Sequence, residues 1–226
     1  MLSDVMEDYL KSIHHLTDGE RVSTSEIAEY LGVSPSTVTS MLAKLEDRGL
    51  ADYEKYEGVV LTEEGETVAL EVLRHHRLIE SYLAEHLDYD WSEVHDEADR
   101  LEHHISEEFE RRIAASLDDP DVDPHGDPIP GADLAPIEEA GTSRLADHGA
   151  GDTVIVERVR DRDGEELEYL SAAGITPGTR LEIEEVAPFG MVTVRLEGGT
   201  QSLPERIATS IRVRAAPDRA EHEADA

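Results

Sequence analysis

Cysteine is absent from this 226-residue sequence. The chain therefore forms no disulfide or thiolate metal site and has no cysteine nucleophile, so any metal ion must be held by carboxylates and imidazoles. Apolar runs of 18 or more residues are also absent, and the first residues, MLSDVMEDYL, lack the basic and apolar regions of a secretory signal. We therefore expect a cytoplasmic protein with no membrane segment.

Basic residues are scarce, because 53 Asp and Glu residues face 20 Lys and Arg residues and give a net charge of −33. The only lysines are Lys11, Lys44 and Lys55, and this bias resembles the proteomes of extreme halophiles. In molar salt the Debye length is about 3 Å, so the acidity does not exclude a DNA partner there. A hydrophobic fraction of 38% over this length excludes wholesale disorder.

Residues 1–62 predict a winged helix-turn-helix. Apolar residues recur at helical spacing over residues 5–16 after a candidate N-cap, Ser3. Ser23 and Glu26 predict a capping box, and a glycine ends that second helix. Ser34 and Pro35 begin a third helix, and alternating residues from 50 to 61 predict a hairpin. This order of elements is typical of a winged DNA-binding domain.

The third helix of this domain turns small polar side chains outward. Hydroxyl groups can contact phosphates or base edges, and each lysine can neutralise a phosphate. The alternative is a merely solvated face, but the turn, the caps and the wing occur together and favour DNA binding. The predicted DNA-contacting residues are Ser34, Ser36, Thr37, Thr39, Ser40, Lys44 and Lys55.

The rest of the chain predicts a second helical region and then a small β domain, so the fold class is mainly α with a β-barrel at the end. Helices are expected over residues 63–140, one of them running from Val94 toward Leu117, with a surface connection at 118–136 and a helical piece at 136–145. Residues 141–150 are expected as a linker. Strands are expected at 153–159, 180–186 and 191–196, with a helix at 165–173, inside a domain of residues 151–215. Residues 216–226 predict a disordered acidic tail.

Four possible metal ligands share one face of a predicted helix. His95, Asp99, Glu102 and His103 stand at i, i+4, i+7 and i+8. Two carboxylates so placed repel each other unless a cation joins them. The alternative is an acidic helix that carries such residues by chance.

A second pair of ligand types, His76 and Glu80, stands one turn apart on the preceding helix and favours metal binding. Oxygen and nitrogen ligands suit Mn²⁺ or Fe²⁺, with Zn²⁺, Co²⁺ and Ni²⁺ able to compete in vitro. No zincin motif and no nucleophile with a base is visible, so an enzyme is not expected.

Short motifs occur in a characteristic order at Met6–Leu10, Val33–Thr39, Tyr53–Thr62, His76–Leu78, Val94–Ala98, Leu101–His104 and Gly126–Gly131, with Ile175–Gly178 in the last domain. Over residues 1–135 these motifs resemble the diphtheria toxin repressor family of iron- and manganese-dependent transcription regulators, and the remainder resembles its optional C-terminal SH3-like, FeoA-like domain. The long form of the family, from a haloarchaeal source, is the expected identity.

The resemblance implies two metal sites. The primary regulatory site consists of Asp8, Asp99, Glu102 and His103, and the carboxylates at positions 8 and 99 resemble the manganese branch of the family. The second site consists of His76, Glu80 and His95, joined by Asp163 and Glu166 from the SH3-like domain. Lys11 stands where the manganese branch has another carboxylate, which argues against a closely spaced metal pair and for two separated sites.

The function implied by the resemblance is a homodimeric repressor that binds double-stranded operator DNA when Mn²⁺ or Fe²⁺ is bound, and that controls metal-uptake genes. Residues 63–140 then form the metal-binding and dimerisation domain, and the metal fixes the first helix against it. A metal-independent winged-helix regulator is the alternative, and it predicts DNA binding insensitive to chelators. A third class, a metal-storage protein or metalloenzyme, predicts turnover or high metal stoichiometry.

Overall fold

A computed structural model describes residues 2–17, 19–136, 141–160 and 164–217 of the chain. The chain divides into two compact units. The first consists of Met1–Ile79, Ala98–Asp119 and Ile129–Pro136, and the second of Glu80–Glu97, Pro120–Pro128 and Ile137–Ala226. Each unit has its own buried apolar cluster.

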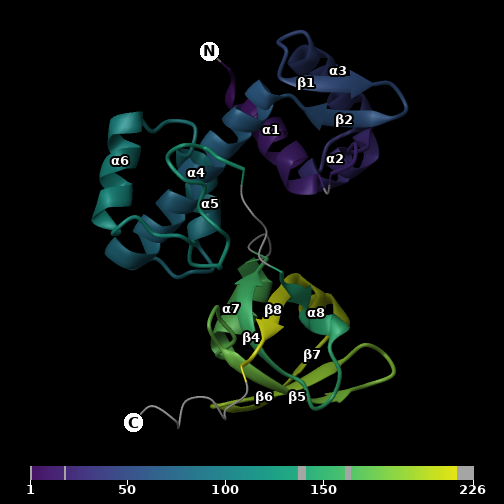
Figure 1. Ribbon diagram of the computed structural model, residues 1–226, viewed down its shortest axis with the longest axis vertical. Coiled ribbons are helices and arrows are strands. Elements are labelled where there is room, and N and C mark those ends of the chain that lie inside the picture. Colours follow the sequence, from purple (N-terminus) through teal and green to yellow (C-terminus); the bar gives the residue numbers. More distant parts are fainter. Residues whose placement is uncertain (1, 18, 137–140, 161–163, 218–226) are drawn as a thin grey trace. The chain divides into compact units, whose positions relative to one another are not determined.

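The first unit begins with a helix-turn-helix and a two-stranded hairpin, which lie side by side in Figure 1. Its elements are α1 (Asp4–Leu16), α2 (Thr24–Leu31), α3 (Pro35–Glu46), β1 (Ala51–Glu54) and β2 (Gly58–Leu61). The apolar stripes predicted from the sequence form its core, in which Leu10, Ile13, Ile27, Val38, Leu42 and Leu45 are fully buried. The predicted winged helix-turn-helix is confirmed.

Local sequence signals fix where these helices begin and end. Ser23 Oγ accepts a hydrogen bond from Glu26 N, and the Glu26 carboxylate accepts one from Ser23 N, so the predicted capping box is present. Gly32 ends α2 in the left-handed region with φ of 64°. Ser34 caps α3 ahead of Pro35. Ser3 occupies the N-cap position of α1 without a side-chain cap.

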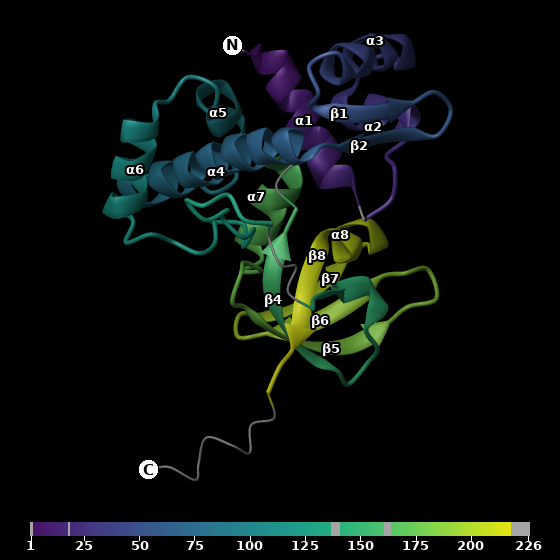
Figure 2. The same cartoon turned by 45° about the horizontal axis from the view of Figure 1, so that its top comes forward.

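Three further helices follow: α4 (Glu63–His86), α5 (Val94–Leu101) and α6 (Glu107–Ser116). Figure 2 shows α4 as one long continuous helix. The single helix expected from Val94 toward Leu117 is wrong, because the chain leaves helical geometry after Leu101 and Ser106 caps a new helix. Glu102 and His103 therefore lie in the turn that follows α5, although Glu102 N still donates to Ala98 O.

The second unit carries a six-stranded antiparallel sheet in the order β3-β8-β4-β5-β6-β7, flanked by helices in Figure 1. Its elements are β3 (Ser143–Arg144), the 3₁₀ turn η1 (Leu145–Asp147), β4 (Thr153–Val159), α7 (Gly164–Ala172), β5 (Arg180–Val186), β6 (Val192–Leu196), β7 (Gly199–Leu203), α8 (Glu205–Ser210) and β8 (Ile211–Ala215). The three predicted strands and the predicted helix are confirmed, whereas β3, β7, α8 and β8 were not predicted.

Two predicted connections differ from the structure. The segment 118–136 is only partly at the surface, because His125 is fully buried and Asp123 and Ile129 are buried. The linker expected at 141–150 contains β3 and η1. The helical piece expected at 136–145 lies partly, and the acidic tail lies mostly, outside the described residues. Among the helices described, none is long and apolar enough to cross a membrane.

Candidate metal centre

The first cluster of possible ligands surrounds the Glu102 carboxylate, which is completely buried. It consists of Asp8 and Lys11 on α1, His76 on α4, Asp99 on α5, and Glu102 and His103 after α5, and we call it the Glu102 cluster. One ligand atom from each of Asp8, Glu102 and His103 lies within 4.8 Å of the others, and the same holds for His76, Asp99 and Glu102. Glu102 belongs to both groups.

Lys11 inserts its ammonium among these carboxylates. Nζ lies 2.7 and 2.9 Å from the two oxygens of Glu102 and 3.0 Å from Asp99 Oδ1. Burial lowers the pKa of Lys11, but the adjacent Glu102 and Asp99 carboxylates outweigh it, and the pKa is raised. The chain thus supplies one cation of its own to offset two acidic groups.

His103 connects the turn after α5 to α1. Its Nε2 lies 3.0 Å from Asp8 Oδ1, and its Nδ1 lies 2.7 Å from Glu7 Oε2. The hydrogen bond with Asp8 raises the pKa of His103 to about 9, against an opposing effect of burial. A metal ion that bound this imidazole would have to displace its proton.

A second layer of contacts holds Glu102 in place. His75 Nδ1 lies 3.2 Å from the backbone oxygen of Glu102, and its Nε2 lies 3.2 Å from Glu110 Oε2. Arg74 donates from Nε to Glu110 Oε1 at 2.5 Å and from Nη1 to the carbonyl of Pro130 at 2.6 Å. The backbone at Glu102 is thus tied through α4 to α6, and such support orients ligand side chains.

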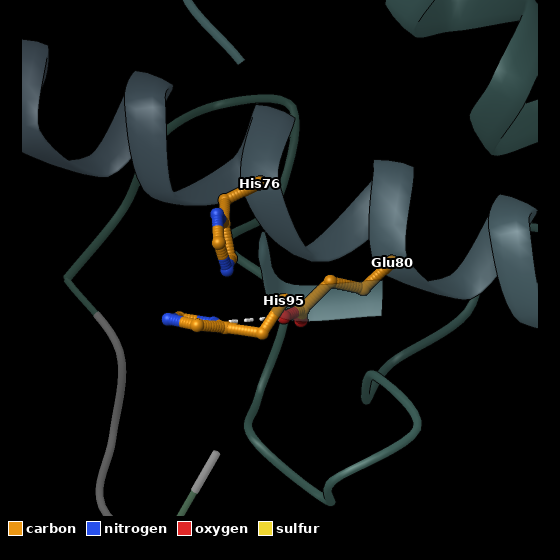
Figure 3. Close-up of side chains that lie close together, drawn as sticks. All are labelled: His76, Glu80 and His95. Carbon is orange, nitrogen blue, oxygen red and sulfur yellow. Dashed lines mark hydrogen bonds and ion pairs between the residues drawn. The ribbon is translucent and has the colours of Figure 1, made fainter. Parts of the chain in front are cut away.

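The second cluster surrounds Glu80, whose carboxylate is also completely buried. His95 Nδ1 lies 3.2 Å from Glu80 Oε1, and His76 stands one turn before Glu80 on α4 (Figure 3). His76, Glu80 and His95 each offer one ligand atom within 4.8 Å of the others, and so do Glu80, Asp123 and His125. We call these five residues the Glu80 cluster.

His125 Nδ1 faces this cluster, while its other ring nitrogen contacts the backbone. Its Nε2 lies 2.8 Å from the backbone oxygen of Trp91, which only accepts, so Nε2 carries the hydrogen. In the neutral ring Nδ1 then carries the lone pair, and it faces Glu80 Oε2 at 3.8 Å. An imidazole that donates its other nitrogen to a carbonyl is the usual form of a metal-bound histidine.

Asp123 and His125 share one tight loop. Asp123 Oδ1 accepts hydrogen bonds from the backbone N–H groups of His125 at 2.8 Å and Asp127 at 2.9 Å. Gly126 has φ of +87°, and a Cβ there would lie 1.9 Å from the carbonyl oxygen of Glu157 on β4. Val159 N donates to His125 O at 2.9 Å, so this loop is fixed against β4.

Most predicted ligands meet in these two clusters. Asp8, Asp99, Glu102 and His103 come together, as do His76, Glu80 and His95. Glu166 is buried at the start of α7 and pairs with Arg206 of α8, and Asp163 lies outside the described residues. Asp123 and His125 were not predicted as possible ligands. The signal that could have indicated them is their Asp-x-His spacing in a Pro- and Gly-rich stretch.

The predicted DNA-contacting residues lie at the N-cap of α3 and along α3, except for Lys55, which lies in the turn between β1 and β2. Ser34, Ser36, Thr37, Thr39, Ser40, Lys44 and Lys55 are all exposed. Thr39 and Ser40 donate hydrogen bonds to backbone oxygens one turn earlier, and the Ser34 hydroxyl contacts the hydroxyls of Ser36 and Thr37. Hydroxyl groups held in this way by the helix can still accept hydrogen bonds from a partner.

Models of three protein families match the chain in succession. "Iron dependent repressor, N-terminal DNA binding domain" matches residues 1–59, "Iron dependent repressor, metal binding and dimerisation domain" matches residues 62–131, and "FeoA domain" matches residues 143–215.

Individual proteins match over nearly the whole chain. The iron-dependent repressor IdeR of Mycobacterium tuberculosis is 34% identical over 225 residues, which covers 94% of this chain and 97% of IdeR. The diphtheria toxin repressor of Corynebacterium glutamicum is 33% identical over 222 residues, with 94% and 96% covered. A solved manganese-dependent transcriptional repressor in complex with manganese has 40% identity and a TM-score of 0.85, covering 93% of this chain and 100% of that structure.

Proposed function

This chain belongs to the family of iron-dependent repressors that includes the diphtheria toxin repressor, and on that premise we propose how it senses metal. It is a metal-dependent DNA-binding repressor that responds to Mn²⁺ or Fe²⁺, dimerises and binds operator DNA. In our proposal Mn²⁺ is the signal, the Glu102 cluster is the sensor, and the regulated genes encode metal uptake.

One observation carries this proposal: Asp8, on the first helix of the DNA-binding domain, lies within reach of Glu102 and His103. These three side chains would hold a divalent cation, and α1 would then be fixed to the turn that follows α5. The cation supplies the positive charge that lets the carboxylates stay together. Metal binding therefore stabilises one placement of the helix-turn-helix against the helices of the dimerisation domain.

The donor atoms of the cluster fit Mn²⁺. Asp8, Asp99 and Glu102 offer hard carboxylate oxygens, and His103 offers an imidazole nitrogen. A sulfur donor would favour softer ions, and the sequence has no cysteine. Manganese is thus the preferred ion in our proposal, with Fe²⁺ as the second.

DNA affinity follows from the position of the two recognition helices of the dimer. Both enter successive major grooves only when they lie about 34 Å apart, one turn of the duplex. A metal that holds α1 selects this spacing. A coupling of about 1–3 kcal/mol changes operator affinity about 5- to 150-fold, which is enough for a switch.

The test is operator binding by wild type, Asp8→Ala and Asp4→Ala, each measured with chelator and with added Mn²⁺, Fe²⁺ or Zn²⁺. Asp4 is an exposed carboxylate on the first turn of α1 and is the matched control. We expect Mn²⁺ to activate wild type and Asp4→Ala, and to leave Asp8→Ala at its chelated affinity while the dimer persists in gel filtration.

Two results would contradict the proposal. A normal Mn²⁺ response in Asp8→Ala would show that the ion does not act through α1. Chelator-insensitive DNA binding by wild type would favour a metal-independent regulator instead.

A further inference from the structure

We propose that one face of the C-terminal sheet binds the phosphates of DNA that flanks the operator. We call it the arginine face, and its residues are Arg144, Arg158, Arg180, Arg212 and Arg214. The inference rests on the proposed function, since it concerns the same operator complex, and it gives the FeoA-like domain a DNA contact of its own.

Three of these arginines stand in a row across neighbouring strands. Arg212 of β8 is paired in register with Arg144 of β3 on one side and with Arg158 of β4 on the other. Figure 2 shows β4 and β8 side by side. Directly paired residues of antiparallel strands point to the same face, and like charges placed in this way repel each other. A bound anion would remove this repulsion.

A β-bulge in β4 creates half of this row. Val156 pairs with Val213, but the next pair is Arg158 with Arg212, so the register shifts by one residue between them. Without the extra residue, the carboxylate of Glu157 would stand opposite Arg212 and neutralise it. Bulges re-aim side chains, often near functional sites. This bulge brings a second arginine to the row in place of a glutamate.

A second row lies two residues further along β8. Ile155 of β4 is paired with Arg214 of β8 and with Arg180 of β5. Arg214 shares a face with Arg212 because side chains alternate along a strand, and the intervening Val213 is buried on the other face. The arginine face thus spans four adjacent strands, β3, β8, β4 and β5.

The charges of the arginine face are only partly compensated. Arg158 Nη1 lies 3.0 Å from Asp127 Oδ1, and Arg214 pairs with Glu157. Within the described parts of the chain, the guanidinium groups of this face that have no ion pair are those of Arg144, Arg180 and Arg212. A guanidinium group can bind a phosphate through two parallel hydrogen bonds. The face therefore offers several such groups to a ligand with more than one phosphate.

DNA is the ligand that these observations favour. In a chain with a net charge of −33, arginines gathered on one face form an attractive surface for a polyanion. The chain belongs to a family of DNA-binding repressors, and phosphate contacts supply much of the affinity in protein–DNA complexes. An acidic protein surface, including that of a second copy of this chain, is the competing possibility, and the experiment separates the two.

The N-terminal domain has few cations to offer to phosphates. Lys11 contacts two carboxylates of the Glu102 cluster, and Arg21 contacts two carboxylates of β1. Among the described residues of that domain, the basic side chains without an ion pair are Lys44, Arg48 and Lys55. The arginine face supplies as many unpaired cations again, so the FeoA-like domain can add substantially to the neutralisation of phosphates.

The experiment measures the affinity of the full, Mn²⁺-loaded chain for two duplexes across a range of salt concentrations. Both contain one operator, selected by wild type from a random pool, and the long duplex extends it by two helical turns, about 20 base pairs, on each side. The glutamine pair, Arg144→Gln with Arg212→Gln, should bind the long duplex about tenfold more weakly, with a slope of log affinity against log salt lower by about two per protomer. Its binding to the short duplex should equal that of wild type.

Two further variants control for net charge and for folding. Arg111→Gln with Arg112→Gln removes two exposed guanidinium groups from α6 and should leave the binding of both duplexes unchanged. Arg144→Lys with Arg212→Lys keeps the two charges and should retain the wild-type salt slope. The glutamine pair should not lower the melting temperature, because it removes a repulsion between paired residues.

Glu157→Gln provides an arm with the opposite sign. It releases Arg214 from its ion pair, so binding to the long duplex should strengthen by about threefold with a steeper salt slope. A purely structural role of the arginines predicts no such gain, and weaker binding would contradict the inference.

The outcomes separate this inference from the proposed function. Equal Mn²⁺-dependent binding of the long duplex by wild type and by the glutamine pair overturns the inference and leaves the proposed function intact. An equal loss on both duplexes also overturns it, because flanking DNA is then not involved. A changed oligomeric state of the glutamine pair in sedimentation, with DNA binding unchanged, assigns the face to a contact between copies of the chain. Wild type that binds neither duplex with any metal contradicts the proposed function itself.

Discussion

The Glu102 cluster and the Glu80 cluster each surround a fully buried carboxylate, but their nearest charged and polar neighbours differ. Glu102 contacts the Lys11 ammonium and the imidazoles of His76 and His103. Glu80 contacts the imidazoles of His95 and His125. A metal ion entering the first cluster would have to displace the Lys11 ammonium and the His103 proton, whereas in the second cluster it would meet the imidazoles around Glu80. Two sites of similar composition can therefore differ in affinity and in response to pH.

The largest effect on operator affinity is expected when the two buried carboxylates are neutralised in turn, as Glu102→Gln and Glu80→Gln. Each carboxylate belongs to both groups of possible ligands in its cluster. Only the Glu102 cluster contains a side chain of α1. We therefore expect Glu102→Gln to reduce Mn²⁺-activated operator affinity by about 100-fold and Glu80→Gln by about fivefold. Fluorescence anisotropy with a labelled duplex measures both. Equal losses would mean that the two clusters act as one unit.

The next effect is the dependence of metal affinity on pH. Because His103 has a pKa of about 9, above its ordinary value of 6.5, the folded protein without metal holds a proton that metal must displace. Apparent Mn²⁺ affinity should rise about tenfold per pH unit, so about 30-fold from pH 6.5 to 8, and level off above about 9.

The same raised pKa has the opposite consequence for stability in chelator. Protonation of His103 stabilises the folded state fully below pH 6.5, and this stabilisation is lost as the pH rises through about 9.

The pH dependence of Mn²⁺ affinity is measured by calorimetry in buffers of different ionisation enthalpy, which counts the protons released when the ion binds. A pH-independent affinity over this range would exclude His103 as a ligand.

A smaller effect on Mn²⁺ affinity is expected when the Lys11 ammonium is removed. Lys11→Met removes a cation that competes for Asp99 and Glu102, so Mn²⁺ affinity should rise about tenfold. The chelated variant should melt at a lower temperature, because the buried Glu102 carboxylate has then lost its ammonium partner. Titration against a chelating dye and thermal melting measure the two effects. Lys44→Met, an exposed lysine on α3, should change neither.

The smallest effect is expected at Asp123. Asp123→Asn keeps an oxygen to accept from His125 N and Asp127 N but removes the negative charge. We expect metal stoichiometry to fall by one ion per protomer, while operator affinity in Mn²⁺ changes by less than about fivefold. Native mass spectrometry gives the stoichiometry. Unchanged stoichiometry would show that Asp123 is not a ligand.

Local sequence signals predicted the helices that carry these clusters, but they did not predict which helices meet. Helical spacing placed Asp99 and His95 on one helix, and local caps such as Ser23 with Glu26 fixed the ends of α2. Asp8 was predicted as a ligand only from the family resemblance. Periodicity within one segment does not show which other segment it contacts.

Interactions that depend on long-range packing were not predicted. Lys11 contacts Asp99, which lies 88 residues later in the sequence, and Glu102, which lies 91 residues later. No local sequence pattern reveals contacts over such separations. His125 became buried through β4, which lies more than 25 residues further along the chain. The strand β8 was missed because its alternation, Ile211 and Val213 inward, covers only five residues and follows a short helix.

The close approach of Gly126 to β4 makes the placement of one group of possible ligands depend on the folding of the C-terminal sheet. Since Val159 N holds the carbonyl of His125, the imidazole reaches Glu80 only when the C-terminal sheet is in place. A chain shortened before residue 143 retains every residue of the Glu80 cluster in its sequence but has lost the scaffold that presents two of them. The FeoA-like segment is thus a structural support of the Glu80 cluster whether or not it contributes a possible ligand of its own.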